Sequence, residues 1–248
     1  MKIDLNAGLK YLNGDFLINV SIIDPIQRNT AEVLYASREC VMIKDKTSGV
    51  VMLQTENIEL ADSLLDNLPY GTDLVVVHNL ALADLVERKL GYDKRIPCYQ
   101  GVYRKEPFKL PETDLVIRLL REDEADAASQ MYRFTVDDAI KHIRLGLVYG
   151  GFDRGNMVAL IGLHYQGSMG LLEVKQSCRR KGYGEFMEKF LINCQLEKGL
   201  IPYCQIIEDN APSLALQSKL GLDVSNNKLF WMRKKRPDEI EENPCACT

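Results

Sequence analysis

LLEVKQSCRRKGYGE, residues 171–185, joins an apolar strand pattern to a basic turn with two glycines, and an amphipathic helix pattern follows directly. Gly182 and Gly184 carry no Cβ, so the backbone can turn tightly and approach a ligand closely. The first amides of the following helix have no intrahelical partners and attract anions. Arg179, Arg180 and Lys181 add cations suited to phosphate oxygens. The stretch therefore predicts an anion site, and we expect a pyrophosphate as its ligand.

Two motifs in this region resemble those of a known superfamily. Counted from Val174, the pattern Val-x-x-x-x-Arg-x-x-Gly-x-Gly is similar to the acyl-CoA-binding motif of the GNAT superfamily of N-acyltransferases. Residues 210–222, NAPSLALQSKLGL, resemble that superfamily's second motif, Asn-x-x-[Ala/Ser]-x-x-Leu-Tyr-x-Lys-x-Gly-Phe. Its matching positions are Asn210, Ser213, Leu216, Lys219 and Gly221. The tyrosine of that motif falls on Gln217 and its phenylalanine on Leu222.

Other anion-binding turns fit the stretch less well. A dinucleotide-binding turn would place its third glycine on Met187 and leaves too many residues between Val174 and Gly182. A phosphate loop of the NTPase kind requires Gly-Lys-Ser/Thr, which is missing here. For the turn taken alone, an ordinary solvated connection between strand and helix is the alternative.

The pattern of secondary structure agrees with the resemblance. Apolar runs predict strands at residues 115–120, 147–152, 157–164, 169–175, 203–207 and 228–233. Helical spacing predicts helices at 122–133 and 136–145, after the glycine turn, and at 210–221. The resulting order, β-α-α-β-β-β-α-β-α-β, is the one that the superfamily's fold shows. We therefore expect an α+β fold with a mixed sheet, of the GNAT-like acyl-CoA N-acyltransferase type.

The first 105 residues repeat parts of this plan. Residues 76–92, VVHNLALADLVERKLGY, resemble residues 206–222, IIEDNAPSLALQSKLGL, so that Asn79 corresponds to Asn210 and Lys89 to Lys219. We predict a degenerate GNAT-like lobe at 1–105, a linker at 106–113, the acyl-CoA-binding domain at 114–236 and a flexible tail at 237–248. Chance similarity between two amphipathic helices is the alternative to duplication.

The N-terminal copy lacks the glycine turn. Glu56 and Glu59 stand where the other half has arginine and lysine, and their carboxylates would repel a pyrophosphate. We therefore expect this half to bind no nucleotide and to act as a scaffold or as a lid on the acceptor side.

Composition narrows the class of protein. The chain has 248 residues, of which 46% are hydrophobic and 27% charged, and its formal net charge is −4. No apolar run approaches the roughly 20 residues of a membrane span, and the N-terminus has no apolar signal segment. The acidic balance argues against nucleic acid as a partner. Seven scattered cysteines without a Cys/His cluster predict no metal site. We expect a reduced, cytoplasmic protein, monomeric or homodimeric, with no membrane partner.

The resemblance implies a reaction and a set of ligand contacts. The reaction is direct transfer of an acetyl group from acetyl-CoA, the co-substrate, to a primary amine in a ternary complex. Pantetheine would pair with the edge of strand 169–175, and the amide of Val174 would bond to the thioester carbonyl. The expected contacts to acetyl-CoA are Val174, Arg179, Arg180, Lys181, Gly182, Tyr183, Gly184, Asn210 and Ser213.

Three residues are candidates for the general base that deprotonates the amine. Glu173 lies on the ligand strand, but alternation turns it away from Val174 unless a bulge intervenes. His164 follows the preceding strand and has a reference pKa of about 6.5. Glu208 follows strand 203–207. A surface role is an alternative for each of them, and His142 is expected to be a solvated helix residue.

The chain departs from the motif at the general acid. Gln217 replaces the tyrosine that would protonate the departing thiolate, and an amide has no acidic proton to give. Because thiolates leave readily, the loss would slow turnover without abolishing it. We expect an active enzyme with a small-molecule amine as acceptor. The alternatives are a protein amine as acceptor, or a CoA-binding sensor or structural protein.

Overall fold

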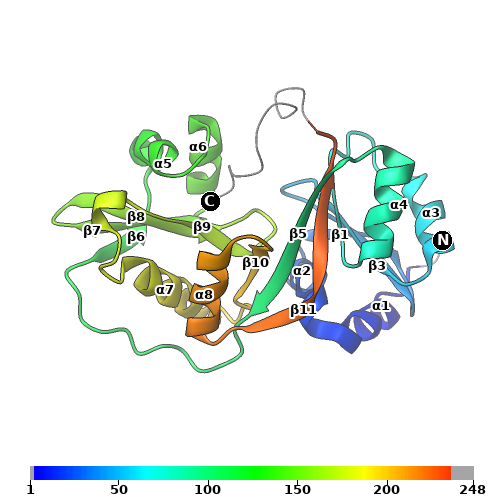
Figure 1. Ribbon diagram of the computed structural model, residues 1–248, viewed down its shortest axis with the longest axis horizontal. Coiled ribbons are helices and arrows are strands. Elements are labelled where there is room, and N and C mark those ends of the chain that lie inside the picture. Colours follow the sequence, from blue (N-terminus) through cyan, green and yellow to red (C-terminus); the bar gives the residue numbers. More distant parts are fainter. Residues whose placement is uncertain (1–2, 236–248) are drawn as a thin grey trace. The chain divides into compact units, whose positions relative to one another are not determined.

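A computed structural model describes residues 3–235, which form two compact units (Figure 1). Unit 1 contains residues 3–102, 205–218 and 222–235, and unit 2 contains residues 103–204 and 219–221. The predicted tail at 237–248 lies outside the described residues.

Unit 1 is built on strands in the order β1-β2-β3-β4-β11-β5. These strands span Ala31–Ala36 (β1), Cys40–Asp45 (β2), Val51–Thr55 (β3), Leu74–Val77 (β4), Lys94–Val102 (β5) and Asp223–Arg233 (β11). Its helices are α1 (Leu5–Leu12), η1 (Asn13–Asp15), α2 (Phe16–Gln27), α3 (Ile58–Leu65) and α4 (Leu80–Leu90). Most of α8 (Ala211–Leu220) also belongs to this unit. Strands β3 and β4 run parallel, whereas the other pairs are antiparallel.

Helices cover both faces of this sheet. On one face, α3 and α4 pack through Leu64 and Leu82 onto Leu53 and other residues of the strands. On the opposite face, α1 and α2 pack through Leu12 and Ile22. Consecutive strand residues point to opposite faces, so a strand buried on both faces is apolar throughout. The fully buried run VMLQT of β3 follows this rule, except at Gln54 and its neighbouring threonine.

Unit 2 contains an antiparallel ladder in the order β9-β8-β7-β6. Its strands are β6 (Val116–Leu119), β7 (Val148–Asp153), β8 (Asn156–Leu163) and β9 (Met169–Val174). Its helices are η2 (Glu122–Glu124), α5 (Ala125–Met131), α6 (Val136–Arg144), η3 (Gln176–Cys178) and α7 (Tyr183–Glu197). Strand β10 (Tyr203–Ile207) begins in this unit.

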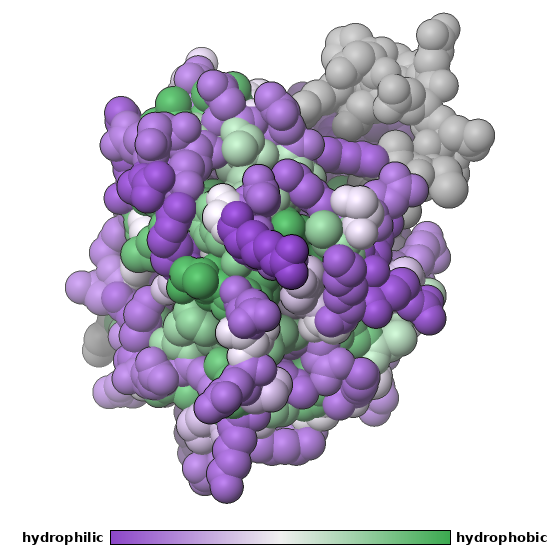
Figure 2. Space-filling view, turned by 90° about the vertical axis from the view of Figure 1, so that its left-hand side faces the viewer, coloured by the Kyte–Doolittle hydropathy of each residue, from purple (hydrophilic) through white to green (hydrophobic). Residues whose placement is uncertain are grey.

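The helices of unit 2 lie on opposite faces of its ladder (Figure 1). Helices α5 and α6 pack onto Phe152 and Leu160, whereas a Cβ at Gly151, the neighbour of Phe152, would meet Met187 of α7. Thr135 caps α6 as predicted, because its hydroxyl accepts a hydrogen bond from the amide of Asp138 at 3.1 Å. One face of the whole molecule is drawn in Figure 2, and hydrophilic side chains cover most of it.

The α+β fold with a mixed sheet is confirmed, and so are the strands and helices predicted for residues 115–233. The compact units do not coincide with the predicted lobes at 1–105 and 114–236. The reason is β11, which pairs with β4 and β5 and so joins the last strand to unit 1. Residues 103–115, which include the predicted linker, form neither helix nor strand. The side chain of Asn193 bonds to both backbone polar groups of Phe108 at 2.8 Å.

Two segments show the repeated features that the sequence indicated. Asn79 caps α4 through the amide of Leu82, and Asn210 likewise accepts from the amide of Ser213. Each helix is followed by a glycine with positive φ, Gly91 and Gly221. The corresponding lysines both form ion pairs with carboxylates of an earlier helix, Lys89 with α3 and Lys219 with α7. Duplication stays a prediction.

Candidate functional site

The glycine turn of unit 2 places an uncapped helix end beyond the end of β9. Gly182 is the N-cap of α7 with φ 83°, and no side chain caps the helix. The first bond of the intrahelical ladder joins the amide of Phe186 to the carbonyl of Gly182 at 3.0 Å. The amides of residues 183–185 therefore lie outside the ladder and carry the positive end of the helix dipole. The predicted anion site has its backbone donors in place.

Two of the three cations of the turn are exposed and unengaged. Arg180 and Lys181 make no ion pair with any residue from 3 to 235. Arg179 differs, because its Nη2 bonds to Oε1 of Glu173 at 2.9 Å and its Nε bonds to the carbonyl of Val174 at 3.1 Å. The turn thus offers two mobile cations and one that is fixed to the strand.

The two glycines of the turn serve different purposes. Gly182 needs its positive φ, which an L side chain adopts at a cost of about 1 kcal/mol or more. Gly184 has no such φ, and a Cβ there would make ordinary contacts of 3.7 Å to Val174 and 3.8 Å to Leu172. The protein itself therefore has room for a methyl group at position 184.

Strand β9 has an edge that is free along most of its length. Cys204 and Met169 form the single register pair between β10 and β9, so in the described chain residues 170–174 have no strand partner on that side. A bulge interrupts the pairing of β9 with β8, and Leu171 within it has φ 57°. The polar groups of Val174 are engaged by Glu173 and Arg179, whose side chains fold back over the strand end.

The bulge does not bring Glu173 and Val174 to one face, since both residues follow it. Val174 faces the start of α7, where it lies 3.7 Å from the Cβ position of Gly184. The carboxylate of Glu173 reaches back to accept a hydrogen bond from the amide of Val174 at 3.1 Å. Among the three candidate bases, Glu173 is therefore the one that lies at the predicted thioester position.

His164 lies beside β9, at the end of β8. Its ring covers Gly170, where a Cβ would come within 2.6 Å of Nε2. Burial and the neighbouring imidazole of His142 lower the pKa of His164 to about 4. The imidazole is therefore neutral at pH 7, and it is a weaker base than its sequence context indicated.

Two further residues considered from the sequence are His142, expected to be solvated, and Glu208, a candidate base. His142 is 5% exposed and stacks on Tyr165, so the expectation of a solvated helix residue was wrong. Helix α6 presents this residue to the core because it shares the buried face of the helix with Ala139 and Ile143. Its Nδ1 donates to the carbonyl oxygen of Asp138 at 2.8 Å. Glu208 belongs to unit 1, where it forms an ion pair with Lys228.

Most of the second motif belongs to unit 1, whereas its Lys219 and Gly221 belong to unit 2. Asn210 and Ser213 form the N-terminal cap of α8, so their side chain and amide already bond to one another at 3.1 Å. Gln217 is 4% exposed within the same helix. Both motifs thus exist as structural features, and the residues predicted to bind acetyl-CoA remain predictions.

We expect Gln217→Tyr to lower thermal stability rather than to restore a general acid. Tyrosine is larger than glutamine, and overpacking a buried position costs about 1 kcal/mol or more. Thermal unfolding of the variant and the wild type measures this effect. A variant of unchanged stability with faster thiol release would instead place position 217 in the catalytic site.

Residues 3–235 lack two features that concern metal ions and membranes. This part of the chain contains no group of three or more His, Cys, Asp or Glu side chains that could hold a metal ion. None of its helices has both the length and the apolar character needed to cross a bilayer.

Solved structures with the same fold cover nearly the whole chain. A Drosophila protein solved by X-ray crystallography is 14% identical with a TM-score of 0.64, and the alignment covers 92% of this chain and 95% of that one. A GCN5-related N-acetyltransferase-like protein from Streptococcus suis is 15% identical with a TM-score of 0.56, over 93% and 100% of the two chains. A tandem GNAT protein from the clavulanic acid biosynthesis pathway is 12% identical with a TM-score of 0.50, over 88% of each chain.

Sequence comparison adds a family match within the C-terminal half. No curated protein matches the chain. The model of the family described as FR47-like protein matches residues 144–231, which include both motifs and the whole of β9 and α7. The match to the FR47-like family is confined to residues 144–231, and the solved structures show that the chain shares the fold of GCN5-related N-acetyltransferases.

Proposed function

We propose that the chain is an acyl-CoA-dependent N-acetyltransferase whose donor site is the turn between β9 and α7. The observation that carries the proposal is the uncapped start of α7 beside the free edge of β9. The helix amides and the exposed Arg180 and Lys181 suit a pyrophosphate. The unpaired edge suits pantetheine, whose amides can bond to a strand as another strand would.

The thioester supplies the acyl group, and the protein supplies alignment and charge stabilisation. The amide of Val174 would donate to the thioester oxygen as negative charge develops there. In the described structure this amide donates to Glu173, so the carboxylate must leave when the donor binds. A carboxylate freed in this way lies close to the reacting carbonyl. Glu173 is therefore our choice for the general base, acting directly or through a water molecule.

We propose a small-molecule primary amine as the acceptor. A CoA-binding sensor is the second candidate, because two observations favour it. Glu173 and Arg179 engage both polar groups of Val174, and the residue at the position of the motif's acid, Gln217, is buried. A protein amine as acceptor is an outcome that the same assay would detect.

Acetyl-CoA should bind with one site per chain and an affinity between low micromolar and sub-millimolar. Glu56 lies in the turn after β3, where the glycine turn of unit 2 has no counterpart, and its carboxylate would repel a second nucleotide. Calorimetric titration of the whole chain measures the stoichiometry. Two sites per chain would contradict our interpretation of the N-terminal half.

Release of free thiol separates enzyme from sensor. The whole chain is mixed with acetyl-CoA and a panel of small amines, amino acids and lysine-containing peptides, and thiol is followed in a single turnover. We expect release with at least one small amine. Binding of acetyl-CoA without release from any acceptor would support the sensor and reject the enzyme.

A further inference from the structure

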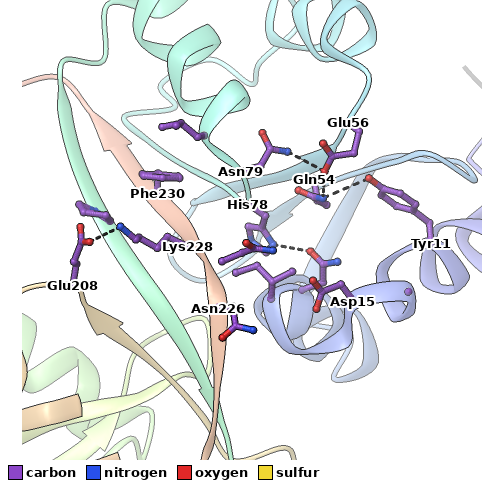
Figure 3. Close-up of a pocket in the computed structure, with 16 residues that line it drawn as sticks. Tyr11, Asp15, Gln54, Glu56, His78, Asn79, Glu208, Asn226, Lys228 and Phe230 are labelled. Carbon is purple, nitrogen blue, oxygen red and sulfur yellow. Dashed lines mark hydrogen bonds and ion pairs between the residues drawn. The ribbon is translucent and has the colours of Figure 1, made fainter. Parts of the chain in front are cut away.

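Unit 1 contains a pocket that belongs to neither motif (Figure 3). It has a volume of about 820 Å³ and lies where the parallel strands β3 and β4 end. Gln54 and Glu56 come from the end of β3 and the turn after it, and His78 and Asn79 follow β4 directly. In open α/β sheets, the crevice outside the carboxyl ends of parallel strands is a common place for ligands. The pocket has the size of a small-molecule site.

One wall of the pocket carries a buried acceptor that has no partner. Gln54 is 7% exposed, and its Oε1 makes no hydrogen bond within the described chain. Its Nε2 donates to the hydroxyl of Tyr11 at 3.5 Å and to Glu56 at 3.3 Å, so Oε1 is the atom of the amide that is left without a hydrogen bond. A buried carbonyl without a donor costs about 1–3 kcal/mol. A ligand that donates a hydrogen bond at this point would recover that loss.

The pocket is negatively charged. Its carboxylates are Asp15, Glu56 and Glu208, and its one cation, Lys228, pairs with Glu208. Figure 3 shows this ion pair on one side of the pocket, with Tyr11, Gln54 and Glu56 on the other. Glu56 accepts only from the amides of Gln54 and Asn79, and among residues 3–235 neither Glu56 nor Asp15 has a cationic partner. Two negative charges are left without a counter-charge.

The base of the pocket supplies no positive charge. His78 is 2% exposed, and burial lowers its pKa to about 3, so its ring is neutral. Its Nδ1 lies 2.9 Å from Oδ1 of Asn19, and its Nε2 lies 3.2 Å from the hydroxyl of Ser21. The ring therefore donates to Asn19 and accepts from Ser21, and both ring nitrogens are engaged. The charge of the pocket is set by its carboxylates.

We propose that this pocket binds a small organic molecule that carries an ammonium group. The ammonium would donate to Oε1 of Gln54 and to the carboxylate of Glu56, and it would neutralise one of the uncompensated charges. The rest of the molecule would lie on the apolar part of the lining, which includes Ile18, Leu80, Pro97 and Phe230. This site lies wholly within unit 1, and the proposal does not depend on acyl transfer in unit 2.

Three matched probes test the choice of ligand class on the whole chain. 4-Phenylbutylamine, 4-phenylbutanol and 4-phenylbutyrate share one apolar body and differ in the charge of the head group. Calorimetry at pH 7.5 and low salt should give binding of the amine, at least tenfold weaker binding of the alcohol and none of the carboxylate. Equal affinity of amine and alcohol, or no binding of the amine, would overturn the proposal.

Substitutions in the pocket lining test whether the amine binds there. Glu56→Gln should weaken binding of 4-phenylbutylamine about tenfold, and Gln54→Met about fivefold, since each removes one acceptor of a charge-assisted hydrogen bond. Glu59→Gln is the control, because it removes the same charge three residues away, on exposed α3 surface outside the pocket lining. Glu56 is exposed, so its substitution leaves the fold intact. An unchanged affinity in Glu56→Gln, or an equal loss in Glu59→Gln, would reject the site.

Discussion

Gly184→Ala should keep the fold and lower the affinity for acetyl-CoA about 100-fold, because the pyrophosphate would lose about two charge-assisted hydrogen bonds to the helix amides. The protein tolerates the methyl group, which would contact Val174 and Leu172 at ordinary distances. Alanine also favours helix more than glycine does. The lower affinity for acetyl-CoA would therefore arise from lost contacts to the ligand and not from a destabilised protein. Calorimetry with acetyl-CoA and thermal unfolding without ligand measure the two quantities separately.

Substitutions at Gly182 provide the comparison. Gly182→Ala and Gly182→Val should lower both stability and affinity, since φ 83° strains any L side chain and more so a β-branched one. Of these variants, only Gly184→Ala should lower the affinity for acetyl-CoA while leaving the stability of the fold unchanged. If that variant binds acetyl-CoA like the wild type, then the start of α7 is not the pyrophosphate site, and the proposed function would need another donor site.

His78 should make the stability of unit 1 depend on pH. Burial lowers the pKa of this imidazole from 6.5 to about 3 in the folded state. Between these values the unfolded chain binds a proton that the folded chain does not. Stability is therefore fully present above pH 6.5 and is lost as the pH falls toward 3. From pH 7.5 to pH 5, His78 should account for about 2 kcal/mol of lost unfolding free energy.

A comparison with His78→Gln isolates this contribution. Asp24 acts in the opposite sense, because burial raises its pKa to about 6 and so favours the folded state as the pH falls. His164 acts in the same sense as His78. Both are present in wild type and variant, so their effects cancel in the difference. Urea unfolding at pH 7.5 and pH 5 should give a stability loss about 2 kcal/mol smaller in His78→Gln. Equal losses in the two proteins would mean that His78 titrates normally.

Local features were predictable because they depend on short-range chemistry. Thr135 and Asn210 cap their helices, because each side chain accepts a hydrogen bond from the amide three residues further along the chain. Gly182 has the positive φ that the turn requires. Alternation and helical spacing placed the strands and helices of residues 115–233 within a few residues. The candidate donor site, the turn between β9 and α7, is therefore formed by one continuous stretch of sequence.

The pairing of the last strand and the pocket of unit 1 depend on residues that are distant along the chain. The pairing of β11 with β4 and β5 is decided by which strand edge is left open, and no local pattern encodes that choice. The pocket of unit 1 combines side chains from α1, β3, the end of β4 and β11. The sequence drew attention to Glu56, Asn79 and Glu208 for other reasons, and it gave no sign that the three lie around one pocket.

The sequence by itself determined the glycine turn, the helix caps and the order of the elements, because backbone conformation and hydrophobic period are local properties. Only the tertiary structure decided the protonation of His164, which depends on burial and on the nearby His142. It also decided that Glu173 bonds to the amide of Val174 and that Oε1 of Gln54 lacks a partner. Burial and hydrogen-bond partners arise from packing between distant segments, and they set both pKa values and the cost of an unpaired polar atom.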